Sequence, residues 1–263
     1  MTFSSDPKVL NSAIADALTE TPVDISTVAP FNGEVSLPGG FITQEGLLVK
    51  YAEVRELNGS DEEAIARSTS LGKALNTILQ RGLVSLGGEK VSKDDLDELL
   101  SADRDAILLG IRRATFGDVA EYRLLCPGCN TESVVGIHLD TDIPVVELGN
   151  PVEDRMWEVE LKSGKAVVTF PKGTTQKALM EVSTKTLAEL NTILLEGCVL
   201  SVNGKASAGM PTVLKLGMGD REIIIADILK KNPGPRLGEV SKVCEACGES
   251  IEAPLSLADL FRL

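Results

Sequence analysis

The chain has 263 residues, of which 43% are hydrophobic and only 3% aromatic, and its formal net charge at pH 7 is −13. This length and apolar content predict a soluble globular protein of one or two domains and exclude a largely disordered chain. The acidic charge argues against a nucleic-acid binder, because phosphate binding needs a concentration of Lys and Arg. The apolar runs are far too short to span a bilayer, and no secretory signal peptide is visible at the N-terminus.

Residues 1–34 are expected to form an N-terminal arm or linker. Residues 8–18 have a short helical pattern, and a segment rich in Pro, Thr and Asp follows them. Segments of this kind at a chain end favour an arm over part of a packed core. We hypothesise that the arm folds onto a partner, as disordered segments do when they bind.

The next segment predicts two strands followed by a long helix. Alternating runs around Phe41 and over Leu47–Val54 indicate a β-hairpin with an edge strand. Ser60 has Glu63 three residues later, which is the spacing of a capping box at a helix N-terminus. Apolar residues at helical spacing then continue as far as Gly82, where the helix is expected to end.

A short strand, two helices and a second hairpin are expected to complete this unit. The apolar run Leu83–Leu86 predicts the strand, and an acidic helix is expected around residues 96–100. A further helix has Asp103 in its first turn, where the helix dipole favours a negative charge, and it ends at Gly117. Residues 121–139 predict a hairpin that carries two cysteines at its tip.

The same order of motifs then occurs a second time. The matched segments are Leu75–Leu79 with Leu190–Leu194, Gly82 with Gly197, Gly88 with Gly204, Asp103-Arg104 with Asp220-Arg221, and Gly117 with Gly234. The offset grows only from 115 residues at Leu75/Leu190 to 118 residues at Cys126/Cys244. The sequence therefore predicts an α+β fold built by internal duplication of a strand–helix–helix–hairpin unit. The first repeat is assigned to 35–146 and the second to 147–263.

Four of the five cysteines form two Cys-x-x-Cys corners, one at the end of each repeat. They are Cys126, Cys129, Cys244 and Cys247. Thiolates two residues apart on a tight turn can face one metal ion, and two such turns complete a tetrahedral four-thiolate zinc site. A redox motif usually opens a helix, whereas Pro127 and Gly128 form a turn followed by β-type residues. The sequence predicts one structural zinc per chain, with redox or disulfide pairing as the alternative.

No catalytic residue is predicted. Four thiolates fill the coordination sphere, whereas a catalytic zinc keeps one open position. The single histidine, His138, is expected on a strand or at the surface, and Cys198 is expected to be a small buried side chain. The two Asp-Arg pairs are interpreted as structural, with the arginines as candidates for contacts between the repeats. Arg112-Arg113 is interpreted as a solvated end of a helix.

Several segments within residues 35–263 together carry a resemblance to a known family. They are Leu37–Gly40, Arg55–Gly59, Asp103–Leu109, Arg113–Asp118, the two cysteine corners, and Ala253–Leu260. These segments resemble the T-even-phage-type baseplate hub assembly proteins, which also occur in phage-tail-like contractile injection systems. The resemblance implies a non-enzymatic hub subunit or hub assembly chaperone. It carries the metal ligands over to the four paired cysteines and carries over no catalytic residue.

The resemblance also implies partners and a location. The partners would be baseplate hub or tail proteins, with no nucleic acid, no membrane span and no small-molecule substrate. The location would be the host or bacterial cytoplasm during assembly, or the tail baseplate in the finished particle. Two other classes stay open: a zinc-ribbon accessory factor of a nucleic-acid machine, and an oxidoreductase that uses one cysteine pair. Salt-sensitive nucleic-acid binding would support the first, and thiol–disulfide exchange would support the second.

Overall fold

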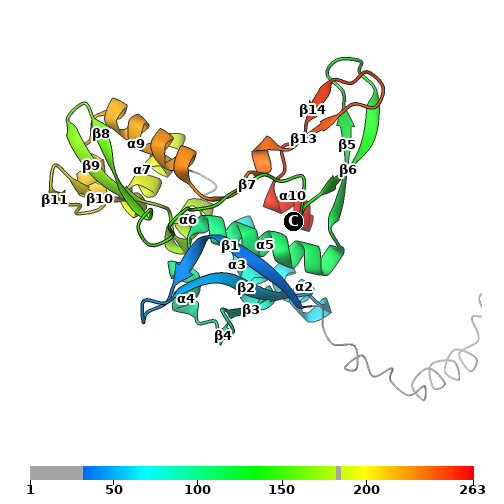
Figure 1. Cartoon of the computed structure of the whole chain (residues 1–263), viewed down its shortest axis with the longest axis horizontal. Coiled ribbons are helices and arrows are strands. Elements are labelled where there is room, and N and C mark those ends of the chain that lie inside the picture. The colour runs from blue at the N-terminus through cyan, green and yellow to red at the C-terminus, as the bar shows by residue number, and fades with distance from the viewer. Residues whose placement is uncertain (1–31, 182–184) are drawn as a thin grey trace, which may run out of the picture. The chain divides into compact units, whose positions relative to one another are not determined.

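A computed structural model of the chain describes residues 32–181 and 185–263 (Figure 1). The helix expected at residues 8–18 and most of the expected arm lie outside the described residues. The first strand, β1 (Asn32–Ile42), begins within the last residues that were assigned to the arm. Between them, the described residues form helices and antiparallel sheets, and none of the helices in these two ranges is long and apolar enough to cross a bilayer.

A four-stranded antiparallel sheet in the order β1-β2-β3-β4 opens the described chain. The other strands are β2 (Leu48–Arg55), β3 (Leu83–Leu86) and β4 (Glu89–Lys90). The predicted hairpin is confirmed, and its register shifts between Ser36 and Phe41. Gly40 in this interruption has a φ of 69°, which glycine adopts without strain. Ala52 and Val54 are two residues apart, so their side chains point to the same face of β2, and both are buried.

The single helix predicted from Ser60 to Gly82 is wrong, because two helices occupy this stretch. They are α2 (Gly59–Ala66) and α3 (Leu71–Gly82). The capping box of α2 uses Asn58 and Asp61 instead of Ser60 and Glu63. The side chain of Ser70 accepts a hydrogen bond from Lys73 N and starts α3. Ser and Thr side chains compete with the backbone for hydrogen bonds, so the Ser68–Ser70 run favours a new cap over a continuous helix.

The two following helices agree with the sequence prediction. They are α4 (Lys93–Glu98) and α5 (Ser101–Phe116), and Gly117 caps α5 with a φ of 84°. Helix α5 packs on β1 and β2, and Ile107 and Ile111 are fully buried there. Arg112 is also buried, which contradicts the predicted solvated helix end. Its Nε donates to the carbonyl oxygen of Leu260 at 2.8 Å, so the C-terminal helix α10 (Leu257–Phe261) covers it.

The elements from β8 to α9 follow the order seen from β1 to α5: two strands, two helices, two strands, two helices. The strands are β8 (Met156–Leu161), β9 (Gly164–Thr169), β10 (Val199–Val202) and β11 (Lys205–Ala206), and the sheet order is β11-β10-β9-β8. The helices are α6 (Gly173–Met180), α7 (Leu187–Cys198), α8 (Met210–Val213) and α9 (Met218–Lys231). Figure 1 shows this second sheet beside α7 and α9.

The repeated string in α3 and α7 is out of register by one residue. Both helices have 12 residues and α7 begins 116 residues after α3, whereas Leu75 and Leu190 are only 115 apart. When the two helices are compared at an offset of 116 residues, Leu79 and Leu195 have the same position in their helices, and both side chains are fully buried. Gly82 is the last residue of α3, and the last residue of α7 is Cys198, one position beyond the Gly197 with which the sequence pairs Gly82.

The two sheets belong to separate apolar cores. The second core contains Val159, Val168, Leu195 and Ile224, all from β8 to α9. The first core includes residues of α3, α5 and the first sheet, and also Phe261 and other residues near the C-terminus. Val240 and the buried apolar residues of the segment 253–261 therefore pack with the first core, although they were assigned to the second repeat.

Short elements connect these regions. They are β7 (Val145–Val146), β12 (Gly234–Pro235) and the 3-10 turn η2 (Leu237–Glu239). Strand β12 pairs antiparallel with β7, and Gly234 has a φ of 110°. A side chain at Gly234 would lie 2.8 Å from the Cβ of Ala102, so close contact with α5 also favours glycine here.

Arg104 joins the two sheets' regions through α6. Its Nη1 donates to the carbonyl oxygen of Leu96 at 2.6 Å, and its Nε donates to Oε1 of Gln176 at 2.6 Å. Arg104 therefore connects the range 35–146 with the range 147–263, as expected for this arginine. Arg221 instead donates to the carbonyl oxygen of Val213 at 3.0 Å and to Oγ1 of Thr192 at 2.8 Å, within its own half. The same expectation is therefore wrong for Arg221.

Candidate metal centre

Two hairpins distant in sequence lie side by side and bring the cysteines together (Figure 1). One hairpin consists of β5 (Val119–Leu125) and β6 (Glu132–His138), and the other of β13 (Ser241–Val243) and β14 (Ser250–Glu252). Cys126, Cys129, Cys244 and Cys247 occupy the two turns, and their Sγ atoms all lie within 4.8 Å of one another. The four residues selected from the sequence thus form one cluster.

The two cysteine turns have the same backbone conformation. In the first turn, Asn130 N donates to the carbonyl oxygen of Cys126 at 3.0 Å, and Cys126 N donates to the carbonyl oxygen of Thr131. In the second, Gly248 N donates to the carbonyl oxygen of Cys244 at 2.8 Å. Asn130 and Gly248 have φ values of 55° and 78°, a left-handed conformation that Gly and Asn tolerate best. This local chemistry aims both thiols of each turn in one direction.

The sulfur separations match a tetrahedral metal site. The Sγ atoms of Cys126 and Cys247 are 3.5 Å apart, and those of Cys129 and Cys244 are 3.8 Å apart. A tetrahedron with zinc–sulfur bonds of about 2.3 Å has sulfur–sulfur edges of about 3.8 Å. A disulfide requires about 2.05 Å, and all five cysteines of the chain are free thiols. The geometry fits a metal ion that binds four thiolates and does not fit a disulfide.

The first cysteine of each turn is buried and the second is exposed. Cys126 and Cys244 pack with Ile251 in a small apolar cluster of their own. Cys129 and Cys247 face solvent. The cluster is therefore shielded on one side only, and apolar packing fixes the two inner sulfurs.

The thiols influence one another's ionisation. The contact with Thr131, 3.2 Å from Sγ to Oγ1, lowers the pKa of Cys129 to about 6. A backbone hydrogen bond at Glu249 lowers the pKa of Cys247, but the neighbouring sulfurs of Cys126 and Cys129 outweigh it and raise this pKa to about 12. Four thiols this close cannot all ionise without a compensating charge. A bound cation supplies that charge and favours the thiolate forms.

The other sequence-selected side chains lie away from the cluster. His138 is in β6, exposed, with its Nδ1 3.3 Å from Oδ2 of Asp118. Cys198 ends α7 inside the second core, and burial raises the pKa of this thiol to about 12. A thiol with such a pKa is a poor nucleophile at neutral pH. Both residues therefore agree with their structural interpretation.

The buried carboxylate of Asp103 was not predicted from the sequence as a functional group. Oδ1 of Asp103 accepts a hydrogen bond from Gly39 N at 2.7 Å, while Oδ2 has no hydrogen-bond partner among the described residues. Burial raises the pKa of Asp103 to about 6, although Gly39 N and the charge of Arg155 act in the opposite direction. An Asp in the first turn of a helix suggested only a dipole interaction. The adjacent glycines at 39 and 40 were the one signal of a close approach between this helix and β1.

Comparison with known proteins adds no assignment. No protein-family model matches the chain, and no curated protein and no solved structure matches it either. The function is therefore inferred from the metal cluster and from the sequence.

Proposed function

We propose that Cys126, Cys129, Cys244 and Cys247 bind one zinc ion per chain, and that this ion is structural. The equal turns, the sulfur separations and the soft donor set support the choice of zinc. Four protein ligands leave no position for water or substrate, which supports a cross-link instead of a catalytic centre. When bound, the ion supplies a rigid joint between two hairpins whose cysteines are 115 residues or more apart in sequence.

We further propose that the two halves are copies of one unit. In the first sheet Ala52 pairs with Leu86, and in the second sheet Ala166 pairs with Val202. The backbone at the start of α5 has φ −61° and ψ 145°, and that at the start of α9 has φ −59° and ψ 148°. Matching registers and matching caps at nearly constant offsets support duplication at residues 35–146 and 147–263. In this interpretation each copy contributes one cysteine turn to the shared zinc.

The proposed biological role is assembly of the central hub of a contractile tail baseplate, without catalysis. The observation that carries it is the cysteine turn that follows the Arg113–Asp118 segment after one strand, since this combination is the most specific part of the family resemblance. Exposed apolar side chains on the hairpins support protein–protein contacts. Leu125, Val134 and Val243 have more than half of their surface exposed. The partners would be hub or tail proteins.

Protein mass spectrometry of purified tail particles, beside the soluble assembly pool of the same cells, tests this role. Stoichiometric presence in the particle identifies a hub subunit, and presence only in the soluble pool with hub proteins identifies an assembly chaperone. Absence from both fractions contradicts the role. In that case, fluorescence anisotropy with labelled DNA and RNA over a salt series tests the zinc-ribbon accessory factor, which requires salt-sensitive binding.

A further inference from the structure

Helix α6 and the residues before it cover a surface of the first half. Gly173 N donates to the carbonyl oxygen of Leu99, and Ser101 N donates to the carbonyl oxygen of Pro171, both at 2.8 Å. A Cβ on Gly173 would lie 2.3 Å from the carbonyl oxygen of Leu96, so only glycine fits this contact. Close backbone contacts therefore hold α6 against the start of α5 within one chain.

No element of the described residues covers the corresponding surface of the second half. At the offset of 117 residues that relates α5 to α9, Asp97 corresponds to Leu214 and Ser101 to Met218. Leu214 is 61% exposed and Met218 is 87% exposed. Together with Arg221 and the exposed Ala188, they form what we call the α9 corner. Leu214 directly follows α8 and Met218 begins α9, so the two exposed apolar side chains lie at the two ends of the turn between these helices.

Arg221 lacks the contact that its counterpart makes with α6. In Arg104, Nη1 donates to the carbonyl oxygen of Leu96 and Nε donates to the side-chain oxygen of Gln176. In Arg221, Nη1 likewise donates to the carbonyl oxygen of Val213, but Nε donates to none of the described residues. The acceptor that corresponds to Gln176 is therefore missing from the part of the chain that the structure describes.

Helix α2 has the features of the missing element. It has eight residues like α6, and the extended N-cap of α2 (φ −116°, ψ 178°) resembles that of α6 (φ −97°, ψ 176°). At the offset of 114 residues, Gly173 corresponds to Gly59 and Gln176 to Glu62, and both of these α2 residues are exposed. No atom lies within 4 Å of a Cβ built on Gly59, and its φ is not positive. The local structure around Gly59 therefore does not require a glycine. Close packing against a carbonyl oxygen of another molecule, like that of Gly173 against Leu96, would require one.

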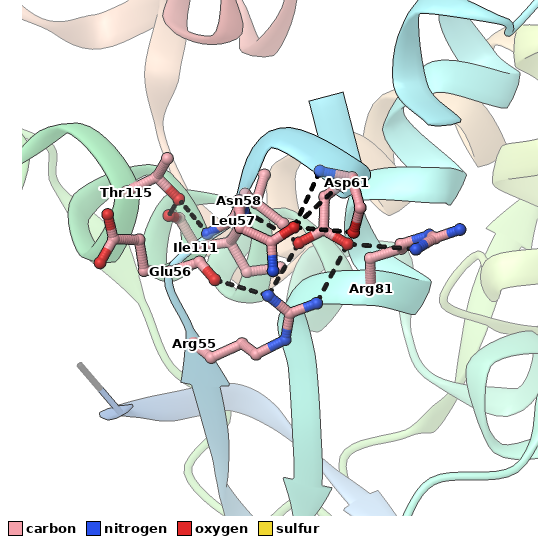
Figure 2. A network of polar contacts seen from close by, with 9 residues as sticks. Arg55, Glu56, Leu57, Asn58, Asp61, Arg81, Ile111 and Thr115 are labelled. Carbon is pink, nitrogen blue, oxygen red and sulfur yellow. Dashed lines mark hydrogen bonds and ion pairs between the residues drawn. The ribbon is translucent and has the colours of Figure 1, made fainter. Parts of the chain in front are cut away.

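The position of α2 is fixed by a polar network, shown in Figure 2. The buried carboxylate of Asp61 accepts hydrogen bonds from Arg55 at 2.8 and 3.1 Å and from Arg81 at 3.3 Å. Leu57 N donates to Oγ1 of Thr115 at 3.1 Å. These bonds hold the inner side of α2 and leave Glu62 facing outward, so the helix can pack on a partner without rearrangement.

An apolar hollow of about 780 Å³ lies beside the exposed side of α2. Its lining includes Leu57, Ile65, Phe116 and Phe261. Exposed Leu214 and Met218 side chains would be buried there if the α9 corner of another molecule contacted α2. The carboxylate of Glu62 would then lie near the guanidinium of Arg221, and such a charge-assisted hydrogen bond is stronger than a neutral one.

We propose that α2 of one molecule packs on the α9 corner of a second copy, as α6 packs on the first half within each chain. This inference rests on the proposed correspondence between the two halves. The interface uses two different surfaces, so it is head-to-tail and continues from molecule to molecule or closes into a ring.

Sedimentation velocity of the zinc-loaded full chain over a concentration series tests the proposal. We expect the wild type to form species larger than a dimer as concentration rises. Met218→Glu places a charge in the α9 corner, and Gly59→Val places a branched side chain on the side of α2 that makes the contact. Each substitution should weaken self-association about tenfold or more. Leu229→Glu is the matched control, because Leu229 is exposed on the same helix away from the corner, and it should associate like the wild type.

Mixing the two single variants separates this interface from a symmetric one. Met218→Glu retains an intact α2 and Gly59→Val retains an intact corner, so the equimolar mixture should form a one-to-one dimer that neither variant forms alone. Glu62→Gln, which imitates Gln176, should preserve association. A wild type that stays monomeric, a mixture that stays monomeric, or variants that associate like the control would each overturn the proposal. Zinc content measured on the same samples distinguishes this failure from failure of the metal centre.

Discussion

Arg104 and Leu96 are joined by a hydrogen bond of 2.6 Å from guanidinium Nη1 to carbonyl oxygen, across eight residues of sequence. Arg221 and Val213 make the same bond at 3.0 Å, across the same eight residues. In each half, an arginine in the first turn of the long helix thus caps the carbonyl end of the preceding short helix. Those carbonyl groups have no partner within the short helix itself.

Replacing these arginines should destabilise the protein to different degrees. Arg104→Ala leaves the buried oxygens of Leu96 and Gln176 without their donor, so we expect a loss of about 3 kcal/mol in the free energy of unfolding. Arg221→Ala should cost about 1 kcal/mol, because Arg221 is only partly buried. Urea unfolding measures both values, with Arg67→Ala as an exposed control near zero. A loss for Arg104→Ala no larger than that control would refute the structural role.

Two glycines at the same helix position should respond in opposite ways to alanine. Gly173→Ala places a methyl group against the carbonyl oxygen of Leu96 at 2.3 Å, and we expect it to cost about 1–3 kcal/mol. Gly59→Ala meets nothing within 4 Å and should be neutral or stabilise by about 0.5 kcal/mol. Thermal unfolding at low protein concentration compares the two variants. Equal effects would mean that α6 does not pack on the first half as described.

The buried Asp103 should make stability depend on pH near neutrality. Its pKa in the folded state is about 6, above the ordinary value of 3.8, so the folded state binds the proton more tightly than the unfolded state. The contribution of Asp103 to stability therefore falls as pH rises through 6, by about 1 kcal/mol between pH 5 and pH 7. Asp103→Asn should remove this part of the dependence. The difference between wild type and variant, measured from pH 5 to 7.5, cancels contributions from the cysteines; a difference that does not change with pH would contradict the shift.

Loss of one cysteine should loosen both hairpins. A structural zinc contributes on the order of 10 kcal/mol to folding, and removal of one ligand should lose a large part of it. After Cys126→Ser we expect faster hydrogen exchange in β13 and β14 as well as in β5 and β6. Cys198→Ser is the control for a thiol outside the cluster. Faster exchange in the β5–β6 hairpin alone would mean that the two turns do not share an ion.

Local chemistry made several elements predictable from the sequence. The two cysteine turns, the hairpins around them and the end of α5 at Gly117 depend on residues next to one another in the chain. The turn residues and glycines that set these features act through their own backbone preferences. The candidate metal cluster followed from the same local patterns, because two equal turns have to meet to complete four ligands.

Contacts between distant residues decided what the sequence could not predict. Arg112 is buried because α10 returns to cover it 148 residues later. The break between α2 and α3 is an exception, because it depends on a local cap at Ser70 that the helical apolar pattern conceals. The identical strings begin at the fifth residue of α3 and at the fourth residue of α7, so sequence identity alone does not give the position of a residue in its helix.

The zinc content of the purified full chain tests the central claim most directly. Elemental analysis should find one zinc per chain in the wild type and in Cys198→Ser. It should find little or none in Cys126→Ser and equally little in Cys244→Ser, because one ion needs both turns. Two ions per wild-type chain, or zinc retained after either substitution, would contradict a single shared site.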